Sequence, residues 1–483
     1  MSKFNSNSSK TTLTENLAGG QAYSQSNELA LVSLLLTSFV NDQFYKTAQA
    51  SLDDMRKLVS KIEDKEFVAK AAIFARDRFN MRSITHAISG ELTSYISGKE
   101  WGKNFYEKIV TRVDDMTEII SYYLTYKTIK DNPKFPNALK KGFAKAFDKF
   151  NAYQLAKYRS ENKEVKLVDV VNIVHPVPTD KNKDALQQLI KGTLRNVETW
   201  EAKLSQTGQV AESEEDLDKL KSDAWKELIL SKKIGYFALL RNLRNIINQA
   251  PDCIKEACEL LTDEKSIKNS RVLPFRFSTA YDEISKLGSS KEIREVLVAI
   301  SKALDISVMN VPKLEGSTLV VLDVSGSMRG KADAIASLFG AILAKANNCD
   351  MMTFSTRSNY VQYNPMDSVM TIKKSFVFTG GGTNFKSIFT TANQAYENVI
   401  ILSDMQGWIG YDTPSAEFKQ YKSKYNCEPH VFSWDLAGYG SLQLPEKQVY
   451  CLAGFSDKVF DIIKLLKSDK NALLNEIRAI SLN

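Results

Sequence analysis

The sequence predicts a multidomain protein in which a long all-α part is followed by one α/β domain. Helical patterns dominate the first 312 of the 483 residues, and no strand pattern of comparable quality interrupts them. In residues 313–483, short apolar runs alternate with helical patterns, which is typical of a doubly wound parallel sheet. The first part is longer than one typical domain, whereas the second part has the length of a single domain.

The helical part has no clean repeat of fixed period, so its interpretation depends on the number and length of its helices. Short connections favour antiparallel neighbouring helices, and a long array of such pairs indicates an α-solenoid of the HEAT type. Residues 1–20 are rich in Ser, Asn and Thr, and we expect them to be disordered, like the acidic stretch Ala211–Asp218. Outside these two segments, helices are predicted over Glu28–Val40, Asp53–Ile62, Lys65–Phe79, Ile84–Ser97, Arg112–Tyr126, Asn137–Lys149, Tyr153–Asn162, Leu167–Ile173, Lys183–Lys191, Ala224–Leu230, Gly235–Gln249, Ile254–Leu261 and Ser290–Ala303.

The α/β part alternates strands and helices in a regular order. Strands are predicted at Leu319–Leu322, Asp350–Phe354, Val399–Leu402, Pro429–Trp434 and Gln448–Leu452. Helices are predicted at Asp333–Ala346, Phe385–Tyr396, Pro414–Lys424 and Ser456–Leu466. This order predicts a parallel sheet with helices on its faces.

Hard oxygen donors follow two of these strands and also occur in a glycine-rich loop between them. The first strand runs into Asp323, Ser325 and Ser327, which supply one carboxylate and two hydroxyls at alternate positions. A glycine-rich loop offers the hydroxyl of Thr383, and another apolar strand ends beside the carboxylate of Asp404. Ligands of open α/β sheets gather outside the carboxyl ends of the strands, and oxygen donors suit a divalent cation such as Mg²⁺. In the competing interpretation, the two aspartates only cap the helices that follow them.

This pattern resembles the von Willebrand factor A domain and its metal-ion-dependent adhesion site. The resemblance implies that these five residues bind Mg²⁺ or another divalent cation, some of them through water, and that an acidic group of a partner fills the open position. The segment Gly326–Ala332 lacks the spacing of a phosphate-binding loop, which argues against a nucleotide cofactor. The site also has no nucleophile–base pair, so we do not expect an enzyme.

The cysteines and the apolar stretches of the chain indicate its cellular compartment. The five cysteines form no metal-binding or paired spacing, which suits reduced thiols in a cytoplasmic protein. No signal peptide opens the chain, and its longest apolar stretch is too short to span a membrane.

Motifs in the helical part, together with this domain order, resemble the TROVE-module proteins of the Ro 60-kDa autoantigen family. The resemblance runs from about residue 20 to the end, where Gly454–Phe455 matches the family's C-terminal pattern. It implies a HEAT-like helical ring over residues 21–312, followed by the von Willebrand A domain over residues 313–483. The motifs are Asp77–Ser83, Asn172–Pro178, Thr199–Glu201, Ala238–Leu243 and Leu273–Phe277.

The family resemblance implies RNA binding. Ro-family rings bind Y RNAs on their outer surface, pass the single-stranded 3′ ends of misfolded or structured RNAs through the central hole, and in bacteria work with an exoribonuclease. We therefore expect a scaffold for noncoding RNA in quality control or processing. The alternative is a protein-docking module that uses its Mg²⁺ site without binding RNA.

Charge supports an RNA surface in one segment. The whole chain carries a net charge of +7. Residues 127–203 hold 16 basic and 9 acidic residues, so this segment alone has a net charge as large as that of the whole chain. Clustered Lys and Arg are what phosphate binding requires. The family places a lysine at Lys157 and a histidine at His175 on its RNA surface, but its second basic residue has no match here because Glu161 stands near that place. We expect five residues of this cluster to contact RNA: Lys157, Arg159, Lys163, Lys166 and His175. In the alternative interpretation, the lysines and the arginine form a solvated helix face, and His175 is a hydrogen-bonded residue at the end of a helix.

Overall fold

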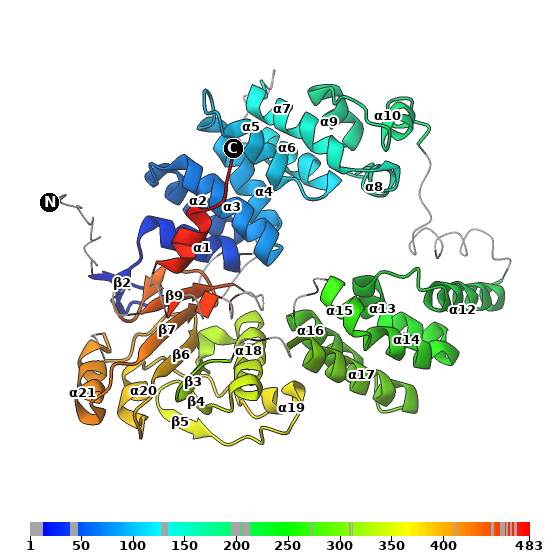
Figure 1. Cartoon of the computed structure of the whole chain (residues 1–483). Helices are drawn as coiled ribbons and strands as arrows, with labels where there is room; N and C mark the ends of the chain where they lie inside the picture. The colour runs from blue at the N-terminus through cyan, green and yellow to red at the C-terminus, as the bar shows by residue number, and fades with distance from the viewer. Residues whose placement is uncertain are drawn as a thin grey trace. The chain divides into compact units, whose positions relative to one another are not determined.

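The chain forms two compact units in a computed structural model (Figure 1). One unit joins Met1–Leu92 to Val311–Asp367 and Thr371–Leu482, and the other comprises Thr93–Asn310 with Ser368–Met370 and Asn483. No helix in the described part of the chain is long and apolar enough to cross a bilayer. The structure describes residues 13–38, 47–126, 134–194, 204, 213–270, 272, 274–308, 311, 313–410, 413–445, 449–454, 459, 462–463, 466–467 and 471–483. The motif Thr199–Glu201, Leu273, Phe455 and most of the predicted helix Ser456–Leu466 lie outside these residues.

A six-stranded sheet in the order β5-β4-β3-β6-β7-β9 forms the centre of the first unit. The two middle strands, β3 and β6, are buried along their whole length. Their parallel register pairs Leu322 with Leu402, so their carboxyl ends lie side by side. The strands are β3 Thr318–Asp323, β4 Asp350–Phe354, β5 Ser358–Val361, β6 Asn398–Ser403, β7 His430–Asp435 and β9 Tyr450–Ala453. The helices of this part are η4 Gly326–Met328, α18 Lys331–Asn347, α19 Val369–Lys373, α20 Lys386–Thr391, α21 Ser415–Tyr425 and α23 Ala472–Arg478.

Two features of this domain differ from the sequence prediction. The sheet is not wholly parallel, because β5 turns back after β4 and pairs with it antiparallel at the edge. Helix α20 ends at Thr391 instead of Tyr396, and the buried Tyr396 is held in the irregular segment before β6 by contacts with other elements. Its hydroxyl donates to Asp350 Oδ2 (2.7 Å), and its amide donates to the Tyr421 hydroxyl (2.9 Å).

The N-terminal residues of the chain also belong to this unit. Helix α1 packs against β9, and α3 packs against α23. Residues 13–20, which we expected to be disordered, instead provide β1 and a turn, because β2 pairs with the short strand β8 of the α/β part. The elements are β1 Leu13–Glu15, β2 Gln21–Ser24, α1 Asn27–Thr37, α2 Ala48–Lys61, α3 Lys65–Phe79, α4 Ser83–Glu91 and β8 Ser441–Leu442.

The second unit is helical throughout its described part. Its helices are α5 Gly102–Ile109, α6 Val113–Tyr126, α7 Asn137–Ala146, α8 Ala152–Lys157, α9 Leu167–Val174, α10 Lys183–Ile190, α12 Glu214–Leu230, α13 Tyr236–Gln249, α14 Ile254–Leu261, α15 Glu264–Ser270, α16 Pro274–Ser285 and α17 Lys291–Val308, with short 3₁₀ turns at Leu92–Ser94, Phe147–Lys149 and Pro251–Cys253. The predicted order, a helical region followed by an α/β domain, is confirmed.

Helices α5 and α7 cross closely in this unit. A Cβ atom on Gly142 would lie 2.5 Å from the Lys103 carbonyl oxygen and 2.5 Å from Tyr106 Cβ. Tyr106 is fully buried and makes an edge-to-face contact with Phe143. The absence of a side chain at Gly142 therefore allows the two helix backbones to approach.

Two helix boundaries in this unit differ from those predicted. Helix α8 ends at Lys157 because Tyr158 and then Ser160, with φ of 56°, leave the helical region. The acidic stretch that we expected to be disordered begins α12 at Glu214. Ser213 accepts a hydrogen bond from the Asp216 amide (3.1 Å), and acidic side chains are favourable in the first turn of a helix.

Candidate functional site

The five candidate metal ligands are all buried where the ends of β3 and β6 meet neighbouring loops. Their exposed fractions range from 0 to 8 %, in the order Asp323 0 %, Ser325 1 %, Ser327 8 %, Thr383 2 % and Asp404 1 %. Backbone hydrogen bonds bring the glycine-rich loop to the loop after β3, from Gly326 N to Gly381 O (3.1 Å) and from Gly380 N to Val324 O (3.0 Å). The fold thus brings together loops that lie far apart in the sequence.

Asp323 is fixed by hydrogen bonds to both of its carboxylate oxygens. The Ser325 amide donates to Oδ1 (2.9 Å), and Ser403 Oγ donates to Oδ2 (2.6 Å). The hydroxyls of Ser325 and Ser327 lie 3.3 Å apart. One carboxylate oxygen and two hydroxyls therefore lie close together at the end of β3.

Asp404 is held by fewer hydrogen bonds than Asp323. Its Oδ1 accepts a hydrogen bond from the Gln406 amide (3.2 Å), whereas its buried Oδ2 has no hydrogen-bond partner among the described residues. Burial raises the pKa of Asp404, and the charge of Asp323 raises it further, while hydrogen bonds from Ser327 and Gln406 oppose the shift. Two buried carboxylates that disfavour each other's ionised form are stabilised when a cation lies between them.

The donor set fits a hard divalent cation, because it consists of carboxylate and hydroxyl oxygens only. In the described part of the chain, no three or more His, Cys, Asp or Glu side chains cluster in a metal-binding arrangement. A cation here would therefore depend on the hydroxyls of Ser325, Ser327 and Thr383 as well as on the two carboxylates. Such a cation would supply a Lewis-acidic coordination position for an acidic group.

Sequence reasoning missed three residues that support this site. Ser403 bonds Asp323, Gln406 bonds Asp404, and the buried Asp435 at the end of β7 adds a further negative charge that raises the pKa of Asp404. Ser403 and Asp435 follow apolar strand runs, so polar residues at strand ends were the available signal. Gln406 lies in a loop and carries no such signal.

The candidate RNA residues lie on α8, on the loop after it and at the end of α9. Lys157, Lys163, Lys166 and His175 are exposed, and Arg159 is partly buried. Helix α9 separates Lys166 from His175 by about 13 Å at 1.5 Å per residue. His175 is the C-cap of α9, with φ of 48°, and its amide donates to Val171 O (2.9 Å). Lys166 and His175 are therefore too far apart to belong to one small pocket.

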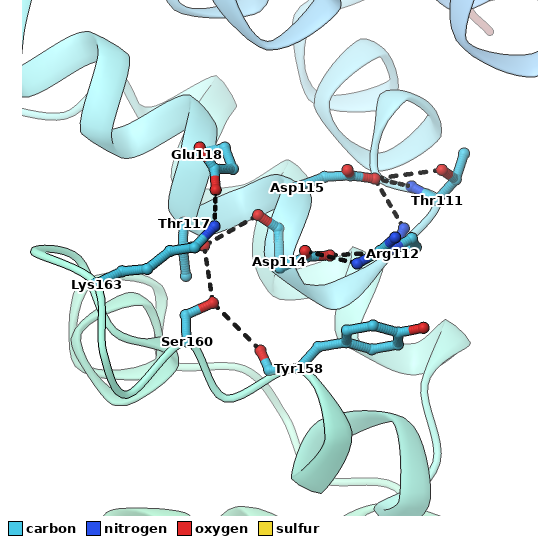
Figure 2. A network of polar contacts seen from close by, with 9 residues as sticks. All are labelled: Thr111, Arg112, Asp114, Asp115, Thr117, Glu118, Tyr158, Ser160 and Lys163. Carbon is cyan, nitrogen blue, oxygen red and sulfur yellow. Dashed lines mark hydrogen bonds and ion pairs between the residues drawn. The ribbon is translucent and has the colours of Figure 1, made fainter. Parts of the chain in front are cut away.

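The loop after α8 is held by polar contacts to α6, which Figure 2 shows. Thr117 Oγ1 and Ser160 Oγ lie 3.3 Å apart, and Lys163 forms an ion pair with Glu118. Arg112 forms a two-bond ion pair with Asp114, with its guanidinium 4.3 Å from the ring centre of Tyr158. The loop that carries the basic residues is therefore anchored at several points.

The five candidates differ in how available their charges are. Arg159 donates to the Leu194 carbonyl and to Glu161 Oε2 (3.0 Å), so its guanidinium holds local structure. Lys163 shares its charge with Glu118. Lys157 and Lys166 have no carboxylate partner among the described residues, and Lys157 Nζ lies 5.7 Å from the ring centre of Tyr153, which is 48 % exposed. Tyr153 was not among the predicted contacts, although an aromatic residue beside a basic cluster was a usable signal.

The chain combines a helical region with an α/β domain whose central strands end in buried oxygen donors. This combination defines a class of proteins in which a helical region is joined to a von Willebrand A-like domain. The family model described as "TROVE domain" matches residues 21–212 and 192–313, and the model described as "VWA domain containing CoxE-like protein" matches residues 277–420. The TROVE matches together span more than half of the sequence. The chain therefore belongs to the TROVE-domain family, as its motifs predicted.

Known proteins resemble different shares of the chain. Telomerase protein component 1 of Mus musculus and that of Rattus norvegicus are each 23% identical in an alignment of 351 positions, which covers 54% of this chain and only 13% of those proteins. The crystal structure of the Deinococcus radiodurans Ro (Rsr) protein aligns with 94% of this chain and 99% of its own, with a TM-score of 0.61 and 16% identity. This structural likeness concerns the fold.

Proposed function

We propose that this protein binds noncoding RNA through the exposed strip Lys157, Lys166 and His175 with Tyr153. The observation that carries the proposal is the position of Lys157 beside the exposed ring of Tyr153. A cation and an aromatic face side by side suit a phosphate and a neighbouring base of single-stranded RNA. Membership of the TROVE family supports the same function, and two relatives are protein components of telomerase.

The proposed ligands are Y-like RNA and misfolded or structured RNA with a single-stranded 3′ end. In this proposal the protein is a cytoplasmic, non-catalytic scaffold in RNA quality control or processing. The five cysteines are all unbridged, which suits a reducing compartment. The buried oxygen cluster around Asp323 and Asp404 binds Mg²⁺ and recruits an acidic group of a partner protein, for which an exoribonuclease is a candidate.

Reversing the charges of Lys157 and Lys166 should weaken RNA binding. We expect Lys157→Glu with Lys166→Glu to lower the affinity for a structured RNA with a single-stranded tail about tenfold or more, because phosphate contacts are lost and counterions are no longer released. The slope of log affinity against log salt concentration should fall by about 1 for each lost phosphate contact. Filter binding or fluorescence anisotropy at several salt concentrations measures both quantities.

The matched control carries the same change of charge elsewhere in the helical unit. Lys265 and Lys268 are exposed on α15, and Lys265→Glu with Lys268→Glu should leave RNA affinity within about twofold of wild type, if net charge alone contributes little. Equal losses in both double variants would mean that the strip is not the binding surface. RNA recovery at background level after ultraviolet crosslinking in cells would favour the protein-docking alternative.

A further inference from the structure

The turn between β1 and β2 contacts the loop that follows β6. Asn16 in this turn is 6 % exposed and donates through Nδ2 to the Gly407 carbonyl (2.6 Å). The Leu17 amide donates to Gln406 Oε1 (2.7 Å). The N-terminal turn therefore bonds both Gln406 and Gly407, two and three residues beyond Asp404.

Asn16 also shapes its own turn. Its Oδ1 accepts hydrogen bonds from the Ala18 amide (3.0 Å) and the Gly20 amide (2.9 Å). The approach to the loop is so close that a Cβ atom on Gly20 would lie 2.1 Å from the Gly407 carbonyl oxygen. The Asn16 side chain thus links the turn to the loop: its Oδ1 accepts hydrogen bonds within the turn, and its Nδ2 donates to the loop.

The loop after β6 contains a residue in an unfavourable backbone conformation, so contacts from other segments are needed to hold it. Met405 has φ of 59°, a left-handed conformation that costs a non-glycine residue about 1 kcal/mol or more. The Gln443 side chain donates to the Met405 carbonyl (2.9 Å). The Gln406 side chain donates to the Asp404 carbonyl (3.1 Å) and to Ser441 Oγ (3.1 Å). Side chains from β8, the residue after it and the N-terminal turn together hold this conformation.

The same loop joins two of the candidate metal ligands. Asp404 begins it and accepts the Gln406 amide through Oδ1. At its other end, the amides of Trp408 (3.2 Å) and Ile409 (3.3 Å) donate to the Thr383 carbonyl. A displacement of residues 406–409 would therefore move both Asp404 and Thr383.

We propose that Asn16 is a positioning residue for the metal site. By holding Gln406 and Gly407, the N-terminal turn fixes the loop from which Asp404 and Thr383 reach the cation, and so sets the affinity for Mg²⁺. This inference rests on the proposed metal site. The N-terminal hairpin then does more than add strand β2 beside β8, because the Asn16 side chain donates to Gly407 in the loop after β6 and not to β8.

Asn16→Asp tests the donor alone. It keeps an oxygen that can accept from Ala18 and Gly20, but it replaces the Nδ2 donor by an oxygen that faces the Gly407 carbonyl. Asn16→Ala removes both functions, and Thr14→Ala on the exposed face of β1 is the matched control. The full-length proteins are compared by hydrogen–deuterium exchange of a peptide covering residues 404–410 and by calorimetric titration with Mg²⁺.

We expect both Asn16 variants to speed exchange in residues 404–410 about tenfold and to weaken Mg²⁺ binding by a similar factor, with Thr14→Ala equal to wild type. Unchanged exchange in Asn16→Asp would overturn the proposal, as would faster exchange with unchanged Mg²⁺ affinity. If wild-type protein bound no Mg²⁺, the metal site itself and the effect of Asn16 on metal affinity would both be wrong. The exchange rates would in that case still decide whether Asn16 holds the loop.

Discussion

Asp323→Ala is expected to abolish Mg²⁺ binding. Asp323 ends the central strand β3, is fully buried, and is held by Ser325 and Ser403 so that it faces the other oxygen donors. Its removal takes away one of the two predicted carboxylate ligands, and the single remaining carboxylate with neutral hydroxyls provides too little negative charge to hold a divalent cation. Calorimetric titration of wild type and variant should show binding in the first and none in the second.

Stability provides a second readout for the same variant. At a Mg²⁺ concentration 100 times the dissociation constant, the wild-type free energy of unfolding should rise by about 2.7 kcal/mol, whereas that of Asp323→Ala should not change. Glu397→Ala is the control, because this exposed carboxylate precedes β6 at the opposite end of the strand from Asp404. Since the RNA strip lies in the other unit, RNA affinity should persist in Asp323→Ala. Mg²⁺ binding that survived the substitution would refute the proposed ligand set.

Gly142→Val should destabilise the helical unit by about 3 kcal/mol, at the upper end of the usual cost of overpacking. The added carbon atoms would meet the Lys103 carbonyl and the buried Tyr106 at the crossing of α5 and α7, where backbone has to move to make room. Valine has a better helix propensity than glycine, so any destabilisation reflects the contact and not the helix itself. Urea unfolding followed by circular dichroism measures the change.

Lys141→Val provides the comparison at the neighbouring position of α7. Lys141 is exposed, so this substitution introduces the same β-branched side chain without a steric conflict. We expect its effect to stay within about 0.5 kcal/mol. A Gly142→Val protein as stable as Lys141→Val would show that the α5–α7 contact adapts easily.

The elements predictable from sequence were those whose environment leaves a local pattern. Strands β3 and β6 are buried on both faces, so they appear in the sequence as continuous apolar runs. The polar residues that follow them lie together at the carboxyl ends of these strands, as predicted. The edge strand β5 is only partly buried and has no such run. The acidic start of α12 was misjudged because composition outweighed the capping signal of Ser213.

Other parts of the site depend on contacts between distant residues and leave no local signal. Asn16 bonds Gly407, a residue 391 positions away, so its short polar segment could not be distinguished from a disordered terminus. Arg159 was grouped with the exposed cations by charge alone, although its partners are the Leu194 carbonyl and Glu161. The contacts of Asn16 with Gly407 and of Arg159 with Leu194 both join residues far apart in the sequence.

The packing of the N-terminal helices against the last elements of the α/β part also determines when the chain can finish folding. Apolar residues of α1, such as Leu36, face β9, and Phe79 of α3 lies against Gly454. A ribosome that adds about 5–20 residues per second makes these partners on the order of 20–80 s after α1. The part of α1 that packs on β9 therefore lacks this partner for most of synthesis, although α2 and α3 follow α1 at once, and a chain that terminates before β9 leaves that part exposed to chaperones and proteases.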